Sequence, residues 1–318
     1  MIELHEGSSR RARIVRTAAR VVARPTLAVF PVRGPIAPLR GVIDLGARAL
    51  PRLSSTEFER VWGDGWRAEL VRPRDGVSGP GAILYFHGGA FVCCGMATHR
   101  RIVERLALRT GLPVLSVAYR QFGEAHVETS IADCLEALDW MVGQGIDPSE
   151  IVLAGDSAGG HLAFAVALAG IQAGVHVGGI VALSPWLDFD CTKHRSHVNA
   201  RTDHLLPARR MMRIARQVNG SRVIDPLRSP VNATLSELPP TLVMCAAGEV
   251  LRHDAELMTE RLEAAGVPVD LHVWEGQVHA FPVLAHLLPE SREALDLVAG
   301  FVADTLATGA VGAVELAS

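Results

Sequence analysis

Residues 151–160 read IVLAGDSAGG, and this stretch decides the fold. Ile151 to Ala154 is a short apolar run typical of a buried strand, and Leu162 to Leu168, apolar on all sides, indicates a buried helix. Between them, residues 155–159 satisfy G-x-S-x-G. A strand that turns sharply into a helix holds the central Ser in strained geometry, and Gly on either side lets neighbouring backbone pass. The stretch therefore predicts a nucleophile, Ser157, at the start of a helix.

Short apolar runs alternate with segments of helical period from residue 81 onward. This alternation predicts an α/β fold whose largely parallel sheet is flanked by helices. The expected strands are 82–86, 113–119, 151–154, 180–183, 241–246 and 269–274, and the expected helices lie near 98–110, 131–142, 162–168, 207–218, 255–265 and 295–306. The alternating pattern of 269–274 predicts a half-exposed strand near a sheet edge. The irregular stretch 185–240 is expected to cross the mouth of a site.

A second motif, His87-Gly88-Gly89-Ala90, follows the strand expected at 82–86. Its two glycines let the backbone fold back so that their N–H groups can point where the Ala158 N–H points. Gly88, Gly89 and Ala158 are therefore the predicted oxyanion hole. His87 is interpreted as a hydrogen-bonding anchor for this loop.

A Ser nucleophile needs a base, and the base needs an orienting carboxylate, in the chain order Ser, acid, His. His279 suits the base because it follows the strand expected at 269–274 in a loop with Gly276. Glu249 suits the acid because it comes just after the strand expected at 241–246. Asp254 is the competitor, but it falls where the next helix begins and is more simply a first-turn charge.

Other interpretations of these residues carry less weight. The G-D-S-A-G-G order fits neither G-x-G-x-x-G nor G-K-[ST], which disfavours nucleotide binding. His194, His197 and His204 lie in a polar loop without firm ligand geometry, so solvent exposure is expected and no metal is predicted. Asp156 is expected to point away from the base, and the Cys93-Cys94 pair to pack in the loop after the second motif. No cofactor is predicted.

Composition excludes several classes of protein. The 31 basic and 34 acidic residues give a net charge of −3, which does not indicate nucleic-acid binding. The five cysteines are odd in number and lack C-x-x-C spacing, and no apolar run is long enough for a membrane anchor. These features predict a cytoplasmic protein, with envelope association as an alternative.

The N-terminal segment has the pattern of an amphipathic helix. Ile14, Ala18 and Val21 fall on one face, and Arg side chains such as Arg13 and Arg20 fall on the other. The arginines that interrupt it also disfavour an export signal. The helix is expected to cover something or to lie on a surface, and weak contact with a membrane surface is one hypothesis.

Taken together, the motifs resemble the hormone-sensitive-lipase-like esterases, or bacterial lipolytic family IV, of the α/β-hydrolase superfamily. The N-terminal segment is similar to those of mycobacterial Lip-type esterases. The resemblance covers about residues 81–305 and depends on six stretches: His87-Gly88-Gly89-Ala90-Phe91, Tyr119-Arg120, residues 155–160, Ser184-Pro185-Trp186-Leu187-Asp188, Leu238-Pro239-Pro240 and Glu249-Val250-Leu251. Two departures stand out: Ala90 replaces the third Gly of H-G-G-G, and residues 121–126 replace the usual L-A-P-E-H-P run.

The resemblance implies one α/β-hydrolase domain over residues 1–318, with a mostly parallel eight-stranded sheet and a helical cap. The cap would comprise about 1–60 and 186–235, and the catalytic core about 61–185 and 236–308. It implies hydrolysis of short- to medium-chain acyl esters without a cofactor, through Ser157, His279 and Glu249.

Two other functions remain as alternatives. An amidase or acyltransferase uses the same triad, and a non-catalytic ligand-binding member has the same fold. The expected partner is a small acyl ester, and a homodimer is a further hypothesis.

Overall fold

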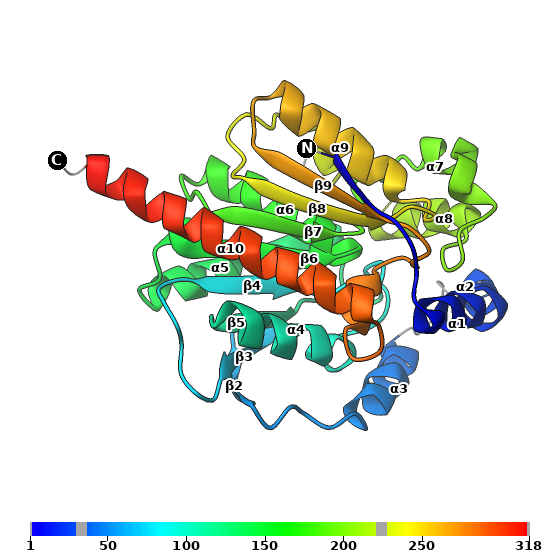
Figure 1. Cartoon of the computed structure of the whole chain (residues 1–318), viewed down its shortest axis with the longest axis horizontal. Coiled ribbons are helices and arrows are strands. Elements are labelled where there is room, and N and C mark those ends of the chain that lie inside the picture. The colour runs from blue at the N-terminus through cyan, green and yellow to red at the C-terminus, as the bar shows by residue number, and fades with distance from the viewer. Residues whose placement is uncertain (1, 30–36, 221–227, 317–318) are drawn as a thin grey trace.

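The computed structural model describes residues 2–29, 37–220 and 228–316, and a nine-stranded sheet lies at its centre (Figure 1). The strands lie in the order β1-β9-β8-β7-β6-β4-β5-β3-β2. Their bounds are β1 (Ile2–His5), β2 (Thr56–Trp62), β3 (Arg67–Pro73), β4 (Ala82–Phe86), β5 (Val114–Ala118), β6 (Ile151–Asp156), β7 (Gly179–Leu183), β8 (Thr241–Ala246) and β9 (Val269–Trp274). All neighbours are parallel except β2–β3 and β3–β5, so the predicted fold class is confirmed.

Helices cover both faces of the sheet (Figure 1). One apolar core packs the sheet against α4 (Met96–Thr110) and α10 (Pro289–Leu316). The other packs it against α5 (Val127–Gly143), α6 (Ala158–Gln172) and α9 (Arg252–Ala264). Since α6 is buried nearly all round, as expected, it holds the nucleophile turn on a rigid element.

The expected strands 82–86, 241–246 and 269–274 begin and end as predicted. Gly111 ends α4 with φ 70°, the left-handed conformation that glycine adopts without strain. In the long insertion after β7, the structure contains the predicted helix as α8 (Ala208–Val218) and a short helix, α7 (Thr192–Ser196), that was not predicted.

The sheet has nine strands where eight were expected, because residues 2–5 form β1. This strand pairs in parallel with β9, and Ile2 is the register partner of Leu271. The expected place of β9 near a sheet edge is confirmed, since only β1 lies beyond it, but the expected half exposure was wrong, because only Asp270 of β9 is exposed. Four residues that include Glu3 and His5 carry too weak an apolar pattern to predict a strand.

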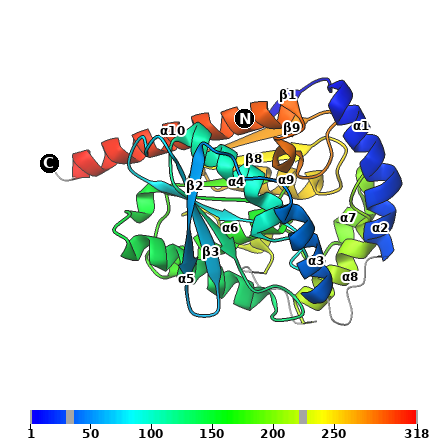
Figure 2. The same cartoon turned by 90° about the horizontal axis from the view of Figure 1, so that it is seen from below.

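The N-terminal helices, in the range expected for the cap, are α1 (Arg10–Ala18), a π-helical segment (Ala19–Ala23), α2 (Arg24–Val29) and α3 (Ala37–Arg48). Together with α7 and α8 these helices lie at one end of the sheet (Figure 2). The predicted cap range 1–60 was too wide, because β1 and the start of β2 belong to the sheet.

The face of the N-terminal helix that packs inward differs from the expected apolar face. Ala12 and Ala19 are buried, whereas Ile14 and Val21 are 69% and 67% exposed. Small side chains let a helix approach its support closely, which leaves the larger ones outside. None of the described helices combines the length and the apolarity needed to cross a bilayer.

Candidate active site

Ser157 stands at the turn from β6 into α6 with φ 54° and ψ −115°. Side chains at the flanking glycines would collide with backbone: a Cβ on Gly155 would lie 2.4 Å from the Gly159 carbonyl, and one on Gly159 would lie 1.8 Å from the Phe86 oxygen. The Ser157 N–H donates to the Leu183 carbonyl at 2.8 Å, which ties the turn to β7. The turn thus imposes a strained backbone on Ser157 at the carboxyl edge of the sheet.

His279 and Glu249 meet at the same edge, through a hydrogen bond between His279 Nδ1 and Glu249 Oε2. The Ala246 N–H donates to Glu249 Oε1 at 2.8 Å, and both side chains are buried. Burial alone lowers the pKa of His279, but the Glu249 charge and hydrogen bond outweigh it and raise that pKa. The pair can therefore accept a proton at His279 and stabilise the resulting imidazolium.

Ser184 is a site residue that was missed as an individual group. Its hydroxyl donates to Glu249 Oε1 at 2.7 Å and accepts the Ala280 N–H at 3.0 Å. It therefore links the acid loop to the base loop, and its backbone has a positive φ of 50°. The signal available was its place directly after the strand expected at 180–183, whose end lies at the same sheet edge.

Asp254, the competing acid, is occupied elsewhere. It accepts the N–H groups of Leu187 at 2.7 Å and Asp188 at 3.0 Å, and it bonds to His194 Nε2. Its negative charge outweighs the effect of burial and raises the pKa of His194 to about 11. Asp254 therefore anchors the insertion and does not reach the base.

The expectation of solvent exposure for His194 was wrong, because its side chain is fully buried against Asp254. His197 and His204 are partly exposed. Within the described ranges, none of these three belongs to a cluster that could hold a metal ion.

The loop after β4 corrects one predicted oxyanion donor. The Gly88 N–H donates to Asp156 Oδ1 at 3.0 Å and is therefore unavailable to a substrate. By contrast, the N–H groups of Gly89, Ala90 and Ala158 donate to no other residue that the structure describes. Gly89 has φ 119°, Ala90 has φ 54° and Phe91 has φ 61°, so this loop turns through three consecutive residues with positive φ.

Asp156 holds that loop through its side chain, which points away from the base, as expected. The carboxylate accepts the Tyr85 hydroxyl at 2.7 Å and lies 3.2 Å from His99 Nε2. Burial opposes a charge on His99, but Asp156 raises its pKa to about 9, so the two form a buried ion pair. His87 donates to the Gly88 carbonyl at 2.7 Å and stacks on Tyr119, in keeping with an anchoring role.

Replacing Asp156 with Ala is expected to lower the free energy of unfolding by about 3–5 kcal/mol, because His99 loses its buried partner. Tyr85→Phe, which removes one neutral donor to the charged carboxylate, should cost about 1.5–3 kcal/mol. Because the pKa of Asp156 is lowered and that of His99 raised to about 9, the Asp156→Ala loss should be full between about pH 4 and 6.5 and shrink as the pH rises through 9. Urea unfolding of both variants across this range checks the prediction; a pH-independent loss would contradict the ion pair.

A cleft opens at Ser157, and its empty space of about 550 Å³ includes open solvent. Its walls come from α2, the loop after β4, and the insertion with α8, and they are apolar apart from Ser157 and Arg210. The lining residues are Leu27, Ala90, Val92, Cys93, Ser157, Trp186, Leu206, Pro207, Arg210, Met211 and Ile214. Cys93 packs in this wall, and all five cysteines are free thiols.

Comparison with known proteins agrees with this arrangement. Residues 83–283 match the family described as the alpha/beta hydrolase fold. The chain belongs to this family. It is 38% identical to Esterase LipU of Mycobacterium tuberculosis, over 91% of this chain and all of LipU, and 35% identical to the Carboxylesterase/phospholipase LipF of the same species, over 99% of this chain and 87% of LipF.

The fold is also that of solved esterases. A crystal structure of an esterase from the bacterial hormone-sensitive lipase family superposes with a TM-score of 0.85 at 32% identity, over 95% of this chain and all of that one. The resemblance to hormone-sensitive-lipase-like esterases is therefore confirmed, as is the enzyme class of serine carboxylester hydrolase.

Proposed function

We propose that this enzyme hydrolyses short- to medium-chain carboxylic esters through an acyl-enzyme formed on Ser157. The observation that carries the proposal is the strained Ser157 in the wall of an apolar cleft, at the sheet edge where His279 pairs with the buried Glu249. The apolar lining of the cleft suits an acyl ester better than a charged substrate. LipU and LipF, which are similar along nearly the whole chain, are both named as esterases.

In the first half-reaction Ser157 Oγ attacks the ester carbonyl while its proton passes to His279 Nε2. The tetrahedral intermediate collapses as the ester C–O bond breaks, and His279 returns the proton to the leaving alcohol. A water then attacks the acyl-enzyme by the same route, which releases the carboxylic acid and restores Ser157. Glu249 keeps Nδ1 of His279 protonated and stabilises the transient imidazolium.

Neither Ser157 Oγ nor His279 Nε2 bonds to another residue in the described part of the chain. Catalytic hydrogen bonds are often long in a free enzyme and tighten when substrate binds. We therefore expect the Ser157 proton to pass to His279 only when substrate is bound.

The oxyanion is assigned to the N–H groups of Gly89, Ala90 and Ala158, with Ala90 in place of Gly88. The assignment follows from the commitment of the Gly88 N–H to Asp156. Ala158 opens α6, where the N-terminal end of the helix adds positive potential. Ala90 stands in place of the third Gly of H-G-G-G. It keeps the backbone N–H, and the only cost is the strain of the Ala90 φ of 54°.

Activity on p-nitrophenyl esters of increasing acyl length tests the proposed substrate class, with matched amide substrates and alcohol acceptors as separate arms. We expect kcat/KM to peak at short or medium acyl chains and to exceed that on the matched amide. A preference for the amide or for acyl transfer would select the amidase or acyltransferase alternative. No turnover and no labelling of Ser157 by a phosphonate would select the non-catalytic binding protein.

Narrowing the cleft should shorten the accepted acyl chain. Ile214 lines the cleft from α8, and its neighbour Arg213 is exposed and does not. Ile214→Trp is expected to lower kcat/KM about tenfold or more for the longest substrates while acetate esters change little, because the added ring occupies acyl space. Arg213→Trp is the matched control, and an equal fall for all chain lengths in Ile214→Trp would contradict this placement of the acyl group.

Activity should fall on the acid side because His279 must be neutral to accept the Ser157 proton. Its pKa lies above the ordinary value near 6.5, since Glu249 outweighs burial, so kcat/KM should decline as the pH falls through that raised pKa. Glu249→Gln removes the charge, and the acid limb of its residual activity should move to lower pH. A pH profile of kcat/KM for both proteins measures the shift; an unchanged acid limb would assign it to another group.

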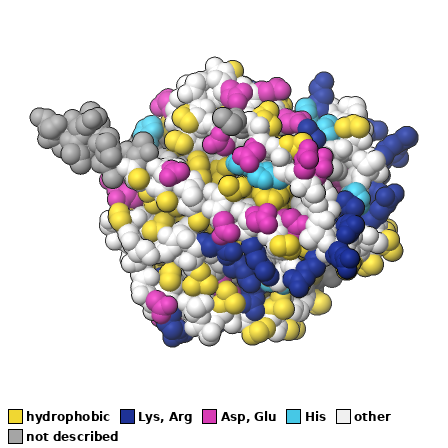
Figure 3. All heavy atoms as spheres, viewed as in Figure 1, with side chains coloured by type: hydrophobic (Ala, Val, Ile, Leu, Met, Phe, Trp, Pro, Cys, Tyr) yellow, Lys and Arg dark blue, Asp and Glu magenta, His cyan; other side chains and the backbone are white. Residues whose placement is uncertain are grey.

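The cap suggests contact with an anionic lipid surface as a second proposal. Ile14, Val21, Val22 and Val29 are exposed beside the arginines of α1 and α2, and Lys and Arg side chains gather over this region (Figure 3). Exposed apolar and basic groups together favour anionic interfaces. Flotation with anionic liposomes at low salt tests this second proposal. Absence of binding would contradict both the contact with lipid and the association with the cell envelope. The homodimer stays a prediction, to be checked by light scattering.

A further inference from the structure

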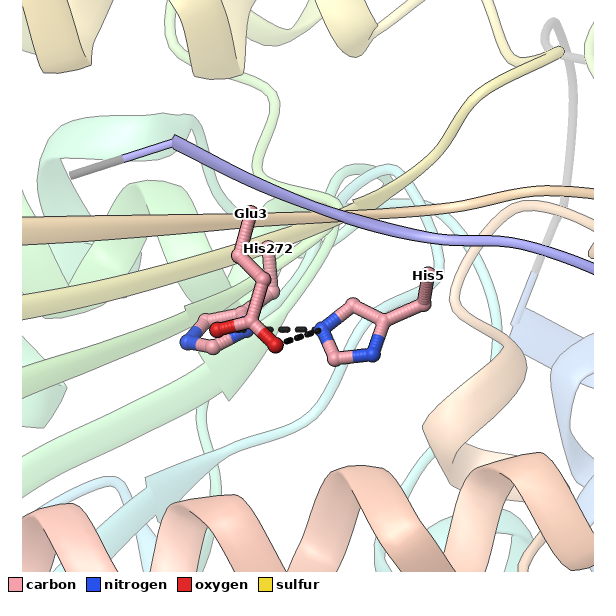
Figure 4. A group of neighbouring side chains, drawn as sticks. All are labelled: Glu3, His5 and His272. Atoms are coloured by element: carbon pink, nitrogen blue, oxygen red, sulfur yellow. Dashed lines mark hydrogen bonds and ion pairs between the residues drawn. The ribbon is translucent and has the colours of Figure 1, made fainter.

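Three side chains that can bind a metal lie together at the edge of the sheet, two of them from β1 and the third from β9, far away in sequence (Figure 4). Glu3 and His5 are two residues apart on β1 and therefore share one face of the strand. His272 of β9 is the register partner of Glu3 in a parallel pair and points to the same face. The pairing of β1 with β9 thus assembles the group.

The distances suit one small ion. His5 Nε2 lies 2.8 Å from His272 Nδ1, and each nitrogen lies 3.7 Å from a Glu3 carboxylate oxygen. A tetrahedral zinc ion with bonds of about 2.0–2.2 Å sets its ligand atoms about 3.3–3.6 Å apart. Moving the two nitrogens apart by roughly 0.5 Å would accommodate the ion, which is within the reach of small ring rotations.

The surroundings hold both rings in place. His5 stacks on Trp274 with ring centroids 3.9 Å apart and planes 5° apart, and His272 is buried. The short contact between His5 and His272 needs one proton between two ring nitrogens, and a metal ion can replace that proton. Glu3 is exposed, which leaves a further coordination position open to water.

We propose that Glu3, His5 and His272 form a zinc site that fastens β1 to β9. Two imidazoles and one carboxylate suit zinc, and also nickel or cobalt as probes, whereas magnesium and calcium favour all-oxygen sites. The Glu275 N–H donates to the His5 carbonyl at 2.9 Å, and the Ser9 hydroxyl at the start of α1 donates to Glu290 at 3.2 Å. A bound ion therefore fixes the strand from which the cap begins, and it takes no part in the ester chemistry.

Zinc titration by calorimetry tests the site, with the metal-free protein, Glu3→Ala, His272→Ala and His176→Ala compared at one pH. Wild type and His176→Ala, which removes an exposed histidine elsewhere, are expected to bind one zinc ion equally well. Each of the other two variants should bind at least tenfold more weakly. Glu3 is exposed, so Glu3→Ala remains informative even if His272→Ala fails to fold.

Cobalt provides an independent readout that separates this site from binding at thiols, such as Cys93 and Cys94 in the loop after β4. The expected spectrum of wild type shows ligand-field bands but no thiolate-to-metal charge transfer. The ligand-field bands should be absent in Glu3→Ala. Saturating zinc should also raise the thermal midpoint of wild type by about 4 °C but not that of Glu3→Ala. Full-affinity zinc binding in both Glu3→Ala and His272→Ala, or no zinc binding by wild type, would overturn the proposal.

Discussion

Replacing Ser157 with Ala is expected to lower kcat for ester hydrolysis by about 10⁵- to 10⁶-fold. The reason is that no acyl-enzyme can form without the hydroxyl, so only the oxyanion donors and substrate binding continue to assist a direct attack by water. KM should change little, because the rest of the cleft, including Met211, is intact. Steady-state kinetics with a p-nitrophenyl ester, calibrated by active-site titration of the wild type, measure the loss.

Ser196→Ala is a matched control, since Ser196 is an exposed serine of α7 outside the cleft. It should keep wild-type kinetics and wild-type labelling by a serine-reactive phosphonate. Ser157→Ala should lose labelling altogether while its unfolding transition stays close to wild type. If Ser157→Ala were still labelled and active, another nucleophile would have to be sought.

Glu249→Ala is expected to lower kcat by about 10³- to 10⁴-fold, because His279 loses the partner that holds its tautomer and stabilises its charged form. The hydrogen bond that His279 donates to Glu249, and the two donors Ser184 and Ala246 that hold the carboxylate, support this size of effect. The removal also leaves those donors unsatisfied, so a modest loss of stability should accompany it.

Asp254→Ala supplies the decisive contrast. This change leaves the buried His194 and the N–H groups of Leu187 and Asp188 without their acceptor, so it should lower the free energy of unfolding by about 3–5 kcal/mol. The kcat of the folded fraction should fall less than about tenfold. Kinetics normalised to titrated active sites and urea unfolding separate the two effects. A larger fall in normalised kcat for Asp254→Ala than for Glu249→Ala would reverse the assignment of the acid.

The sequence predicts the nucleophile turn well because the residues that the turn requires all lie in one short motif. A side chain at position 155 or 159 would collide with backbone atoms. The same steric requirement therefore explains both the glycines of the motif and the geometry of the turn. The placement of Glu249 and His279 at one sheet edge follows from chain order, since each comes after a parallel strand. Such arguments use only neighbours along the chain and the rule that parallel strands end together.

What the sequence could not predict depends on contacts between distant segments. The Gly88 N–H looked available until the structure placed the Asp156 carboxylate beside it, from 68 residues away. The burial of His194 depends on Asp254, which lies 60 residues later. Which face of α1 packs inward likewise depends on the elements that it packs against. Ala12 is buried there, whereas the more apolar Ile14 is exposed.

The pairing of β1 with β9 has a consequence for the order in which the molecule is made. Ile2 finds its sheet partner, Leu271, only after nearly all of the chain has left the ribosome, and Ser9 finds Glu290 later still. Contacts so distant in sequence form late in folding. The central strands can therefore assemble first, and the N-terminal helices close over the cleft as one of the last steps of biosynthesis.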